Sequence, residues 1–278
     1  MHSPSKINLT LQIGALHPNV NLHNLYSISA IIDLKDLIYI KDSEEGSIKF
    51  TGLYGSEVPN DNTVTKTMEL LKLDKPYDIE IVKNIPIGSG LGGGSSNAAT
   101  IICYFGKKYD IPFEDQCKIA TQVGSDVMFF LTMEHSNASP KIGAMQHYGH
   151  EVTQLLGDGS LPCFGILVIP QETCRTKEVF KEFDTDPAVC DLAPFTNKVP
   201  MIKYIESHGN NMTEAILRHK PELKKIYNIV SGCGEYFSFT GSGSSLFVLY
   251  NSQQERADGR AELAKQVPSA HLENFLFL

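Results

Sequence analysis

The alternation of apolar and polar positions predicts a chain in which strands and helices are mixed. Residues 7–13 alternate with the period of a half-buried strand. Residues 27–40 are rich in isoleucine and leucine, and they predict one long strand or two short ones. Further strands are expected at 48–53 and 77–83, the first of them after the turn Glu44-Glu45-Gly46. The first part of the chain therefore supplies strands for a sheet.

Helical spacing of apolar residues is interleaved with these strands. Residues 62–73 predict a helix capped by Asp61 or Asn62, and residues 113–123 predict another. The second half predicts strands at 164–169, 236–240, 246–250 and 271–278, and helices at 176–183, 199–207, 212–219, 223–230 and 253–266. A polar hinge at 157–160 separates the halves. We therefore expect an α+β protein with two domains, 1–156 and 157–278.

A glycine-rich run is the most informative motif. Five glycines fall within positions 88–94, and Ser95 and Ser96 follow at the start of an alanine-rich helical stretch. Glycine lets the backbone approach a ligand closely, and a helix N-terminus favours an anion. Together with the preceding strand, the run predicts a phosphate-binding loop.

Two other phosphate-binding motifs fit less well. A P-loop requires a lysine directly after its last glycine, and no lysine lies between Lys83 and Lys107. The pattern Gly88-x-Gly90-x-x-Gly93 matches the dinucleotide fingerprint, and Asp110 lies near the required distance. However, Pro86 interrupts the step from strand to loop, and a long segment precedes the motif. The dinucleotide interpretation stays open as a weak alternative.

Composition narrows the function classes. The 278 residues are 42% hydrophobic and 20% charged, which is typical of a globular protein, and the net charge of −8 provides no basic field for nucleic acid. No apolar stretch approaches membrane-span length, and the N-terminus has no apolar signal core, so we expect a cytoplasmic protein without a membrane partner. Six scattered cysteines indicate reduced thiols, and His147 and His150 have no ligand cluster around them.

Two further residues could complete a phosphoryl-transfer site. Lys6 stands at the start of the first strand, and Asp126 lies among small residues in Gly124-Ser125-Asp126-Val127. Phosphoryl transfer needs a phosphate cradle, positive charge and a group that orients the acceptor hydroxyl. Either residue alone is more often a surface group, and Asp126 alone could be a helix cap.

The motifs together resemble the superfamily of galactokinase, homoserine kinase, mevalonate kinase and phosphomevalonate kinase. Residues 4–9 match its first motif, 88–99 its ATP loop and 240–247 its C-terminal glycine turn, in the family order. The resemblance implies a ribosomal-protein-S5-like N-terminal domain, a ferredoxin-like C-terminal domain, and an active-site cleft between them.

Within the superfamily, the chain is similar to the 4-diphosphocytidyl-2-C-methyl-D-erythritol kinase branch. The matching segments are Lys-Ile-Asn-Leu at 6–9, the Asp-Asn pair at 61–62, the triple glycine at 92–94 and Gly-x-Asp-Val at 124–127. This resemblance implies an ATP- and Mg²⁺-dependent kinase of non-mevalonate isoprenoid biosynthesis. Its substrate would be a diphosphocytidyl polyol, phosphorylated on the 2-hydroxyl. The chain would act as a monomer or homodimer; the magnesium ligands are not assigned.

The resemblance also assigns roles to residues. Asp126 would accept the proton of the substrate hydroxyl, and Lys6 would hold Asp126 and the phosphoryl group in register. The implied nucleotide-binding residues are Asn62, Lys83, Pro86, Gly88, Gly90, Leu91, Gly92, Gly93, Gly94, Ser95 and Ser96. The implied substrate-binding residues are Asn8, His23, Asp126, Phe180, Gly241, Ser242 and Gly243. Among these, Phe180 would stack on cytosine, and His23 would hydrogen-bond its edge; Phe180 could instead be a core aromatic.

The chain departs from the branch at the substrate end. Leu22 stands where the branch has a tyrosine that stacks on the other face of cytosine, and the later Gly-x-Gly-Glu segment reads Tyr148-Gly149-His150-Glu151. Two alternatives stay open: a superfamily kinase with another small alcohol substrate, and a catalytically silent nucleotide-binding regulator. The presence of both Lys6 and Asp126 favours a kinase.

Overall fold

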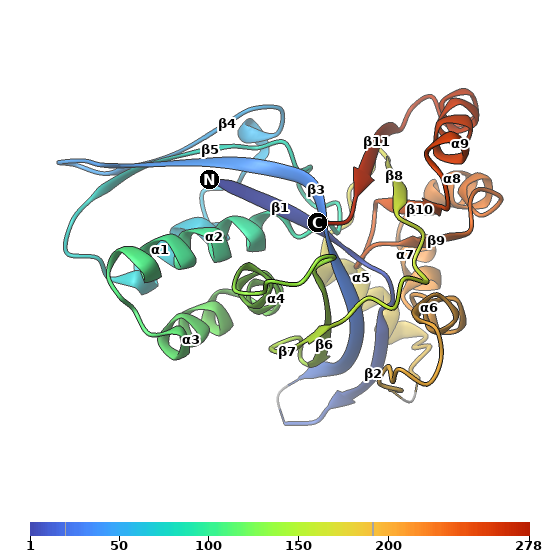
Figure 1. Cartoon of the computed structure of the whole chain (residues 1–278), viewed down its shortest axis with the longest axis horizontal. Helices are drawn as coiled ribbons and strands as arrows, with labels where there is room; N and C mark the ends of the chain where they lie inside the picture. Colours follow the sequence, from blue (N-terminus) through green and yellow to red (C-terminus); the bar gives the residue numbers. More distant parts are fainter. Residues whose placement is uncertain (20, 191) are drawn as a thin grey trace.

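The chain forms two lobes, each built on its own β-sheet (Figure 1). The computed structural model describes residues 1–19, 21–190 and 192–278. Strands up to residue 155 form a seven-stranded sheet, and strands from residue 164 onward form a four-stranded sheet. The expected α+β class is confirmed. The boundary between residues 156 and 157 falls in the connection between the sheets and stays a prediction.

The N-terminal lobe is organised around one very long strand. This strand, β3 (Leu22–Asp42), pairs with β1, β2, β5 and β6, and the order β4-β5-β3-β6-β7 completes the sheet. Its length allows one strand to reach both the outer edge of the lobe and the cleft. The other elements are β1 (His2–Asn8), β2 (Gln12–His17), β4 (Ser47–Thr51), a 3₁₀ turn (Gly55–Glu57), α1 (Thr63–Leu71), β5 (Tyr77–Val82), α2 (Gly93–Lys108), α3 (Phe113–Val123), α4 (Ser125–Glu134), β6 (Ile142–His147) and β7 (Glu151–Leu155).

The C-terminal lobe is an antiparallel sheet with the order β11-β8-β10-β9. Helices α8 and α9 lie on its outer side, drawn in orange and red in Figure 1. Its elements are β8 (Phe164–Ile169), α5 (Thr176–Thr185), α6 (Met201–His208), α7 (Thr213–His219), α8 (Leu223–Val230), β9 (Tyr236–Phe239), β10 (Leu246–Tyr250), α9 (Gln253–Gln266) and β11 (His271–Leu276).

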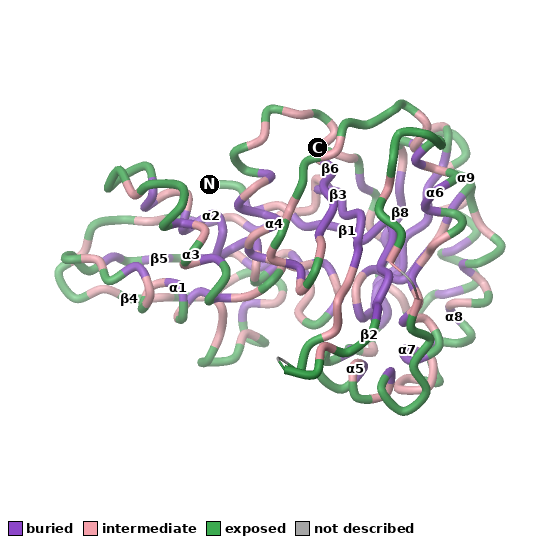
Figure 2. Tube along the Cα trace, turned by 90° about the horizontal axis from the view of Figure 1, so that it is seen from below, coloured by how far each residue is buried: buried purple, intermediate pink, exposed green. Residues whose placement is uncertain are grey.

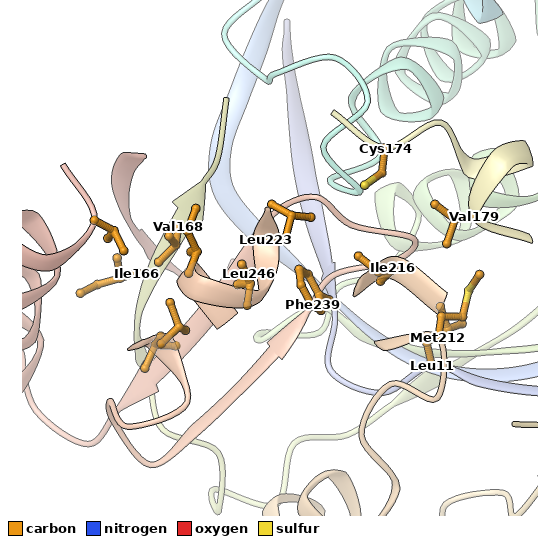
Figure 3. Packing of buried hydrophobic residues seen from close by; sticks show 14 of the residues in the cluster. Leu11, Ile166, Val168, Cys174, Val179, Met212, Ile216, Leu223, Phe239 and Leu246 are labelled. Atoms are coloured by element: carbon orange, nitrogen blue, oxygen red, sulfur yellow. The ribbon is translucent and has the colours of Figure 1, made fainter. Parts of the chain in front are cut away.

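Apolar packing joins the two lobes. Leu11 and Ile13, from the segment between β1 and β3, belong to the same buried cluster as residues of β8, β10 and α7. Figure 3 shows Leu11 beside Met212, and the backbone N–H of Leu11 donates to the carbonyl of Gly209 at 2.8 Å. Buried positions continue from one lobe into the other in Figure 2. The lobes therefore meet in a packed interface, which holds the cleft between them in a defined geometry.

The periodicity predicted some elements better than others. Helices α3, α8 and α9 begin and end at the expected residues, and residues 27–40 form the middle of the single strand β3. Asn62, one of the two expected caps, is the N-cap of α1. The strand expected at 7–13 is divided between β1 and β2, and strands β6 and β7 and helix α4 were not assigned. Helix α4 buries Val127, Phe129, Phe130, Leu131 and Met133, so no polar face reveals its helical period.

No helix in the described part of the chain combines the length and the apolar character needed to cross a bilayer.

Candidate functional site

A cleft of about 550 Å³ lies between the lobes and contains both candidate catalytic residues. Its walls come from β1, the glycine-rich loop, the starts of α1 and α4, helix α5 and the turn at Gly241. Most of the expected site residues line it: Lys6, Asn8, Asn62, Lys83, Pro86, Gly88, Gly90, Leu91, Gly92, Gly93, Gly94, Ser95, Asp126, Phe180, Gly241 and Ser242. Distant segments of the sequence thus meet at one site.

Lys6 and Asp126 form the charged pair of the cleft. Lys6 lies on β1 with 4% of its side chain exposed, and Asp126 lies in the first turn of α4 with 35% exposed. The Lys6 Nζ is 3.7 Å from the Asp126 Oδ2. Burial lowers the pKa of the Lys6 ammonium, and the negative charge of Asp126 partly opposes this shift. The pair thus provides a cation and a carboxylate side by side at the wall of the cleft.

Asn8 is held in one orientation by its neighbours. Its Oδ1 accepts a hydrogen bond from the Lys6 ammonium, and its Nδ2 donates to the hydroxyls of Ser27 at 2.8 Å and Ser29 at 3.0 Å. These two serines lie within the apolar strand β3 and belong to no motif that would mark them in the sequence. Two serines at alternating positions of an otherwise apolar strand are the sequence signal that could have indicated a polar site.

The glycine-rich loop has the backbone freedom and the room that the sequence predicted. Gly90 and Gly92 adopt φ values of +78° and +72°, which side chains rarely tolerate. A Cβ at Gly92 would lie 2.9 Å from the Phe130 ring and 3.2 Å from the Lys6 Cε. Gly92 is the N-cap of α2 and makes no side-chain cap bond, so the first N–H groups of the helix remain available to an anion.

The C-terminal glycine turn contacts this loop directly. The Thr240 hydroxyl donates to the carbonyl oxygen of Gly90 at 3.1 Å, and it accepts the backbone N–H of Asn8 at 3.1 Å. One side chain therefore connects the loop, β1 and the turn. The Ser242 hydroxyl lies 3.0 Å from the Thr176 hydroxyl at the start of α5, which joins the turn to the helix that carries Phe180.

Three of the expected residues do not line the cleft. The Ser96 hydroxyl is buried and lies 2.8 Å from the Ser3 hydroxyl, outside the lining of the cleft. Gly243 packs near Ile216, where a Cβ would lie 3.1 Å from that side chain. His23 has both ring nitrogens occupied, by the Gly14 carbonyl at 2.9 Å and by Asp184 Oδ1 at 2.8 Å. Its expected bond to a base edge stays a prediction that requires the Asp184 contact to open.

Two further residues line the cleft with their polar ends engaged elsewhere. The Asn62 Oδ1 accepts the backbone N–H groups of Val64 at 2.9 Å and Thr65 at 3.1 Å, as expected for a helix cap. The Lys83 ammonium is buried against Asp36, and burial lowers its pKa while Asp36 partly opposes the shift. Asp36 could not be identified from the sequence, because an aspartate inside a strand pattern carries no motif.

Phe180 is half-buried on α5 and lines the cleft. Its ring centroid is 5.9 Å from that of His23, which packs behind it. Leu22 is 53% exposed at the start of β3 and does not contribute to the cleft wall. Phe180 is therefore the aromatic ring that this part of the cleft offers to a ligand.

Comparison with known proteins places this cleft in a family. The family model for the GHMP kinases N terminal domain matches residues 62–134, which include the glycine-rich loop and Asp126. The family model for the GHMP kinases C terminal domain matches residues 200–269. A 4-diphosphocytidyl-2-C-methyl-D-erythritol kinase of Pelagibacter ubique (strain HTCC1062) is 30% identical over 268 residues, covering 91% of this chain and 89% of the relative. The chain belongs to the GHMP kinase family.

Other relatives agree with this assignment. A kinase of the same name from Sulfurihydrogenibium sp. (strain YO3AOP1) is 29% identical to this GHMP kinase over 271 residues. The match covers 90% of each chain. A crystal structure of 4-(cytidine 5'-diphospho)-2C-methyl-D-erythritol kinase superposes with a TM-score of 0.75 at 22% identity, covering 99% of both chains. The Methanococcus jannaschii mevalonate kinase superposes with a TM-score of 0.63 at 19% identity, covering 100% of this chain and 98% of that one. The structural likenesses show a shared fold.

Proposed function

We propose that this GHMP kinase transfers the γ-phosphoryl group of ATP to the 2-hydroxyl of 4-diphosphocytidyl-2-C-methyl-D-erythritol. The observation that carries the proposed chemistry is the Lys6–Asp126 pair, 3.7 Å apart, in the cleft where the two glycine turns meet. Relatives of that name, about 30% identical over nine tenths of the chain, support the choice of substrate.

The proposed mechanism assigns one task to each part of the cleft. The unpaired N–H groups at the start of α2 and the backbone of the loop bind the ATP phosphates. The Asp126 carboxylate accepts the proton of the acceptor hydroxyl as the oxygen attacks phosphorus. The Lys6 ammonium holds this carboxylate and offsets negative charge on the transferred group. Asn8 keeps the ammonium in place through its bond to Nζ.

The residues of the cleft fit a magnesium ion held mainly by ATP. Among the described residues, no three His, Cys, Asp or Glu side chains gather into a ligand set. Magnesium in such enzymes is held by substrate phosphates, water and one or two protein oxygens. Ser95 lines the cleft at the start of α2, and its hydroxyl would supply such an oxygen. When bound, the ion would neutralise phosphate charge.

One observation favours a second candidate, a kinase for another small alcohol. Leu22, which replaces the stacking tyrosine of the branch, lies outside the cleft, and His23, which was expected to contact cytosine, is bonded to Asp184 instead. Phe180 alone would then recognise the base, which leaves the acceptor less tightly specified.

Release of ADP in a coupled assay tests the proposal. The acceptors are 4-diphosphocytidyl-2-C-methyl-D-erythritol, mevalonate, homoserine and galactose, each with Mg·ATP. Turnover with the diphosphocytidyl alcohol alone is the expected result. Activity only with another acceptor would support kinase activity and refute the proposed substrate. ATP binding without turnover on any acceptor would favour a silent regulator. The Asp126→Asn variant serves as the inactive control.

A further inference from the structure

We propose that Lys83 is a positioning residue for the phosphate-binding loop: with Asp36 and Asn97, it ties both ends of the glycine-rich loop to β3. The inference rests on the proposed function in so far as that function requires the loop to bind ATP. It replaces the expected contact of Lys83 with the nucleotide by an action through the backbone. Three observations carry it: the bonds at the start of the loop, the bonds at its end, and the burial of the whole network.

The Asp36 carboxylate fixes the chain where it enters the loop. Asp36 lies on β3 and is completely buried. Its Oδ1 accepts the backbone N–H groups of Asn84 at 2.7 Å and Ile85 at 2.9 Å, in the short segment between β5 and Pro86. A carboxylate that accepts two consecutive backbone donors determines the direction in which the chain leaves the strand.

The other carboxylate oxygen reaches the far end of the loop. The Asp36 Oδ2 accepts the Lys83 ammonium and the Asn97 Nδ2, the latter at 2.9 Å, and Lys83 in turn donates to the Asn97 Oδ1 at 2.9 Å. Asn97 lies in the second turn of α2. A Cβ on Gly93, the first residue of that helix, would lie 3.3 Å from the Lys83 Nζ. The ammonium therefore lies directly behind the helix N-terminus that faces the cleft.

The network continues to the first strand. The Asn97 Nδ2 also donates to the Ser3 hydroxyl at 2.9 Å, which lies 2.8 Å from the Ser96 hydroxyl. Ser3, Ser96 and Asn97 are all buried. Strands β1 and β3, helix α2 and the residues that follow β5 thus meet at one set of polar atoms. Helix α2 and the residues after β5 flank the loop, and β1 carries Lys6.

A role in geometry explains why so many polar groups are buried here. A buried ion pair recovers little net free energy, because both charges lose their hydration. The opposite charges of Lys83 and Asp36 also cancel at a distance, so the pair adds little field for attracting phosphate. What the pair does provide is a set of directional bonds that few other arrangements of the loop could satisfy.

A double-mutant cycle with Lys83→Met, Asp36→Asn and the double variant tests the inference. Dissociation constants for ATP and AMP are measured by calorimetry without an acceptor, together with thermal unfolding of each full-length variant. We expect each single variant to bind ATP about 10- to 100-fold more weakly and the double variant to be no worse than either single variant, as for residues that act as one unit. The loss should be larger for ATP than for AMP, because the loop is expected to bind the β- and γ-phosphates.

Two other outcomes would overturn the inference. If Lys83 contacted the nucleotide itself, Lys83→Met would weaken ATP binding while Asp36→Asn would leave it near the wild-type value. Unchanged ATP affinity in both variants, with lowered unfolding temperatures, would reduce the network to a role in stability. Lys203→Met is the matched control, since Lys203 pairs with Glu206 on the surface and its loss should change neither affinity.

Ser3→Ala keeps the inference testable if the charge variants do not fold. It leaves the Lys83–Asp36 pair intact and removes only the Ser3 hydroxyl, so we expect a folded chain that binds ATP several-fold more weakly. Wild-type affinity in Ser3→Ala would then overturn the inference. A wild-type chain that binds no ATP would instead refute the proposed function, which separates the two failures.

Discussion

Gly90 lies so close to Thr240 that a Cβ at position 90 would be 2.1 Å from the Thr240 carbonyl oxygen. The two glycine motifs, one from each lobe, therefore touch through their backbones. The Thr240 hydroxyl reinforces the contact by its bond to the Gly90 carbonyl at 3.1 Å. The cleft depends on this contact, because it joins the phosphate-binding loop to the lobe that carries Phe180.

Replacing Gly90 by alanine should therefore disrupt the site. The new methyl group would collide with a backbone oxygen, which cannot rotate away, so we expect ATP affinity to fall by about 100-fold or more and the unfolding temperature to drop. Gly88→Ala is the control, because Gly88 also has a positive φ but its Cβ would meet nothing closer than 3.5 Å. Equal losses in calorimetry would show that backbone strain, and not the contact with Thr240, governs the loop.

Asp126→Asn should abolish turnover and retain nucleotide binding. The amide keeps the size of the side chain but cannot accept the hydroxyl proton, so we expect kcat to fall by about 10²- to 10⁴-fold. The dissociation constant for ATP should stay within about threefold of wild type, since the loop backbone is intact. Steady-state kinetics and calorimetry measure the two quantities. A variant with near-normal kcat would contradict the assignment of Asp126 as the base.

Lys6→Met should be inactive and more stable than wild type near neutral pH. Burial lowers the pKa of Lys6 from its usual 10.5, so the folded chain holds the charged form at a free-energy cost. Methionine fills similar space without that cost. We therefore expect the free energy of unfolding to rise by about 1 kcal/mol, which raises Tm by about 2–4 °C in a chain of this size. The loss of kcat should be about 10²- to 10³-fold.

The pH dependence of this difference follows from linkage. Between the lowered pKa in the folded state and 10.5, the unfolded chain binds more protons at Lys6 than the folded chain does. The wild-type contribution to stability therefore increases with pH across that window, and the advantage of Lys6→Met shrinks toward pH 10.5. Thermal unfolding of both chains from pH 7 to 10 measures this difference in stability. An advantage that grows with pH would contradict the lowered pKa.

Phe180→Ala should weaken binding of the acceptor without weakening binding of ATP. Stacking of a base on an aromatic ring contributes about 1–3 kcal/mol, which predicts a KM for the diphosphocytidyl acceptor raised by about 10- to 100-fold. The KM for ATP should stay within about twofold of wild type. Phe180→Tyr, which keeps the ring, is the matched control and should behave nearly as wild type. Equal KM values for the acceptor in all three chains would exclude stacking on Phe180.

The cysteines should differ strongly in reactivity. Burial raises the pKa of the Cys103 thiol to about 12 and that of the buried Cys174 thiol to about 11, so both stay protonated at pH 8. Cys163 is exposed. Because the thiolate is the reactive form, a disulfide reagent at pH 8 should modify Cys163 at least about 100-fold faster than the other two. Mass spectrometry of the native chain locates the label, and early modification of Cys174 would contradict this prediction.

Features whose signal lies in a few neighbouring residues could be predicted before the fold was known. Helices α3 and α8 were predictable because buried positions recur along them with a 3.6-residue period. The glycine-rich loop was predictable because both its glycines and the helix after it are contiguous. Lys6 and Asp126 were identified through motifs that each occupy only a few consecutive residues.

Long-range packing determines which polar atoms face the cleft and which are bonded inside the protein. Lys83 and Ser96 stand beside the glycine motif in the sequence, yet Asp36 and Ser3, from distant strands, take their polar ends away from the cleft. His23 is bonded to Asp184 of the other lobe. A buried donor or acceptor must find a partner, and the partner is set by strand pairing and by the packing of the lobes, neither of which local periodicity records.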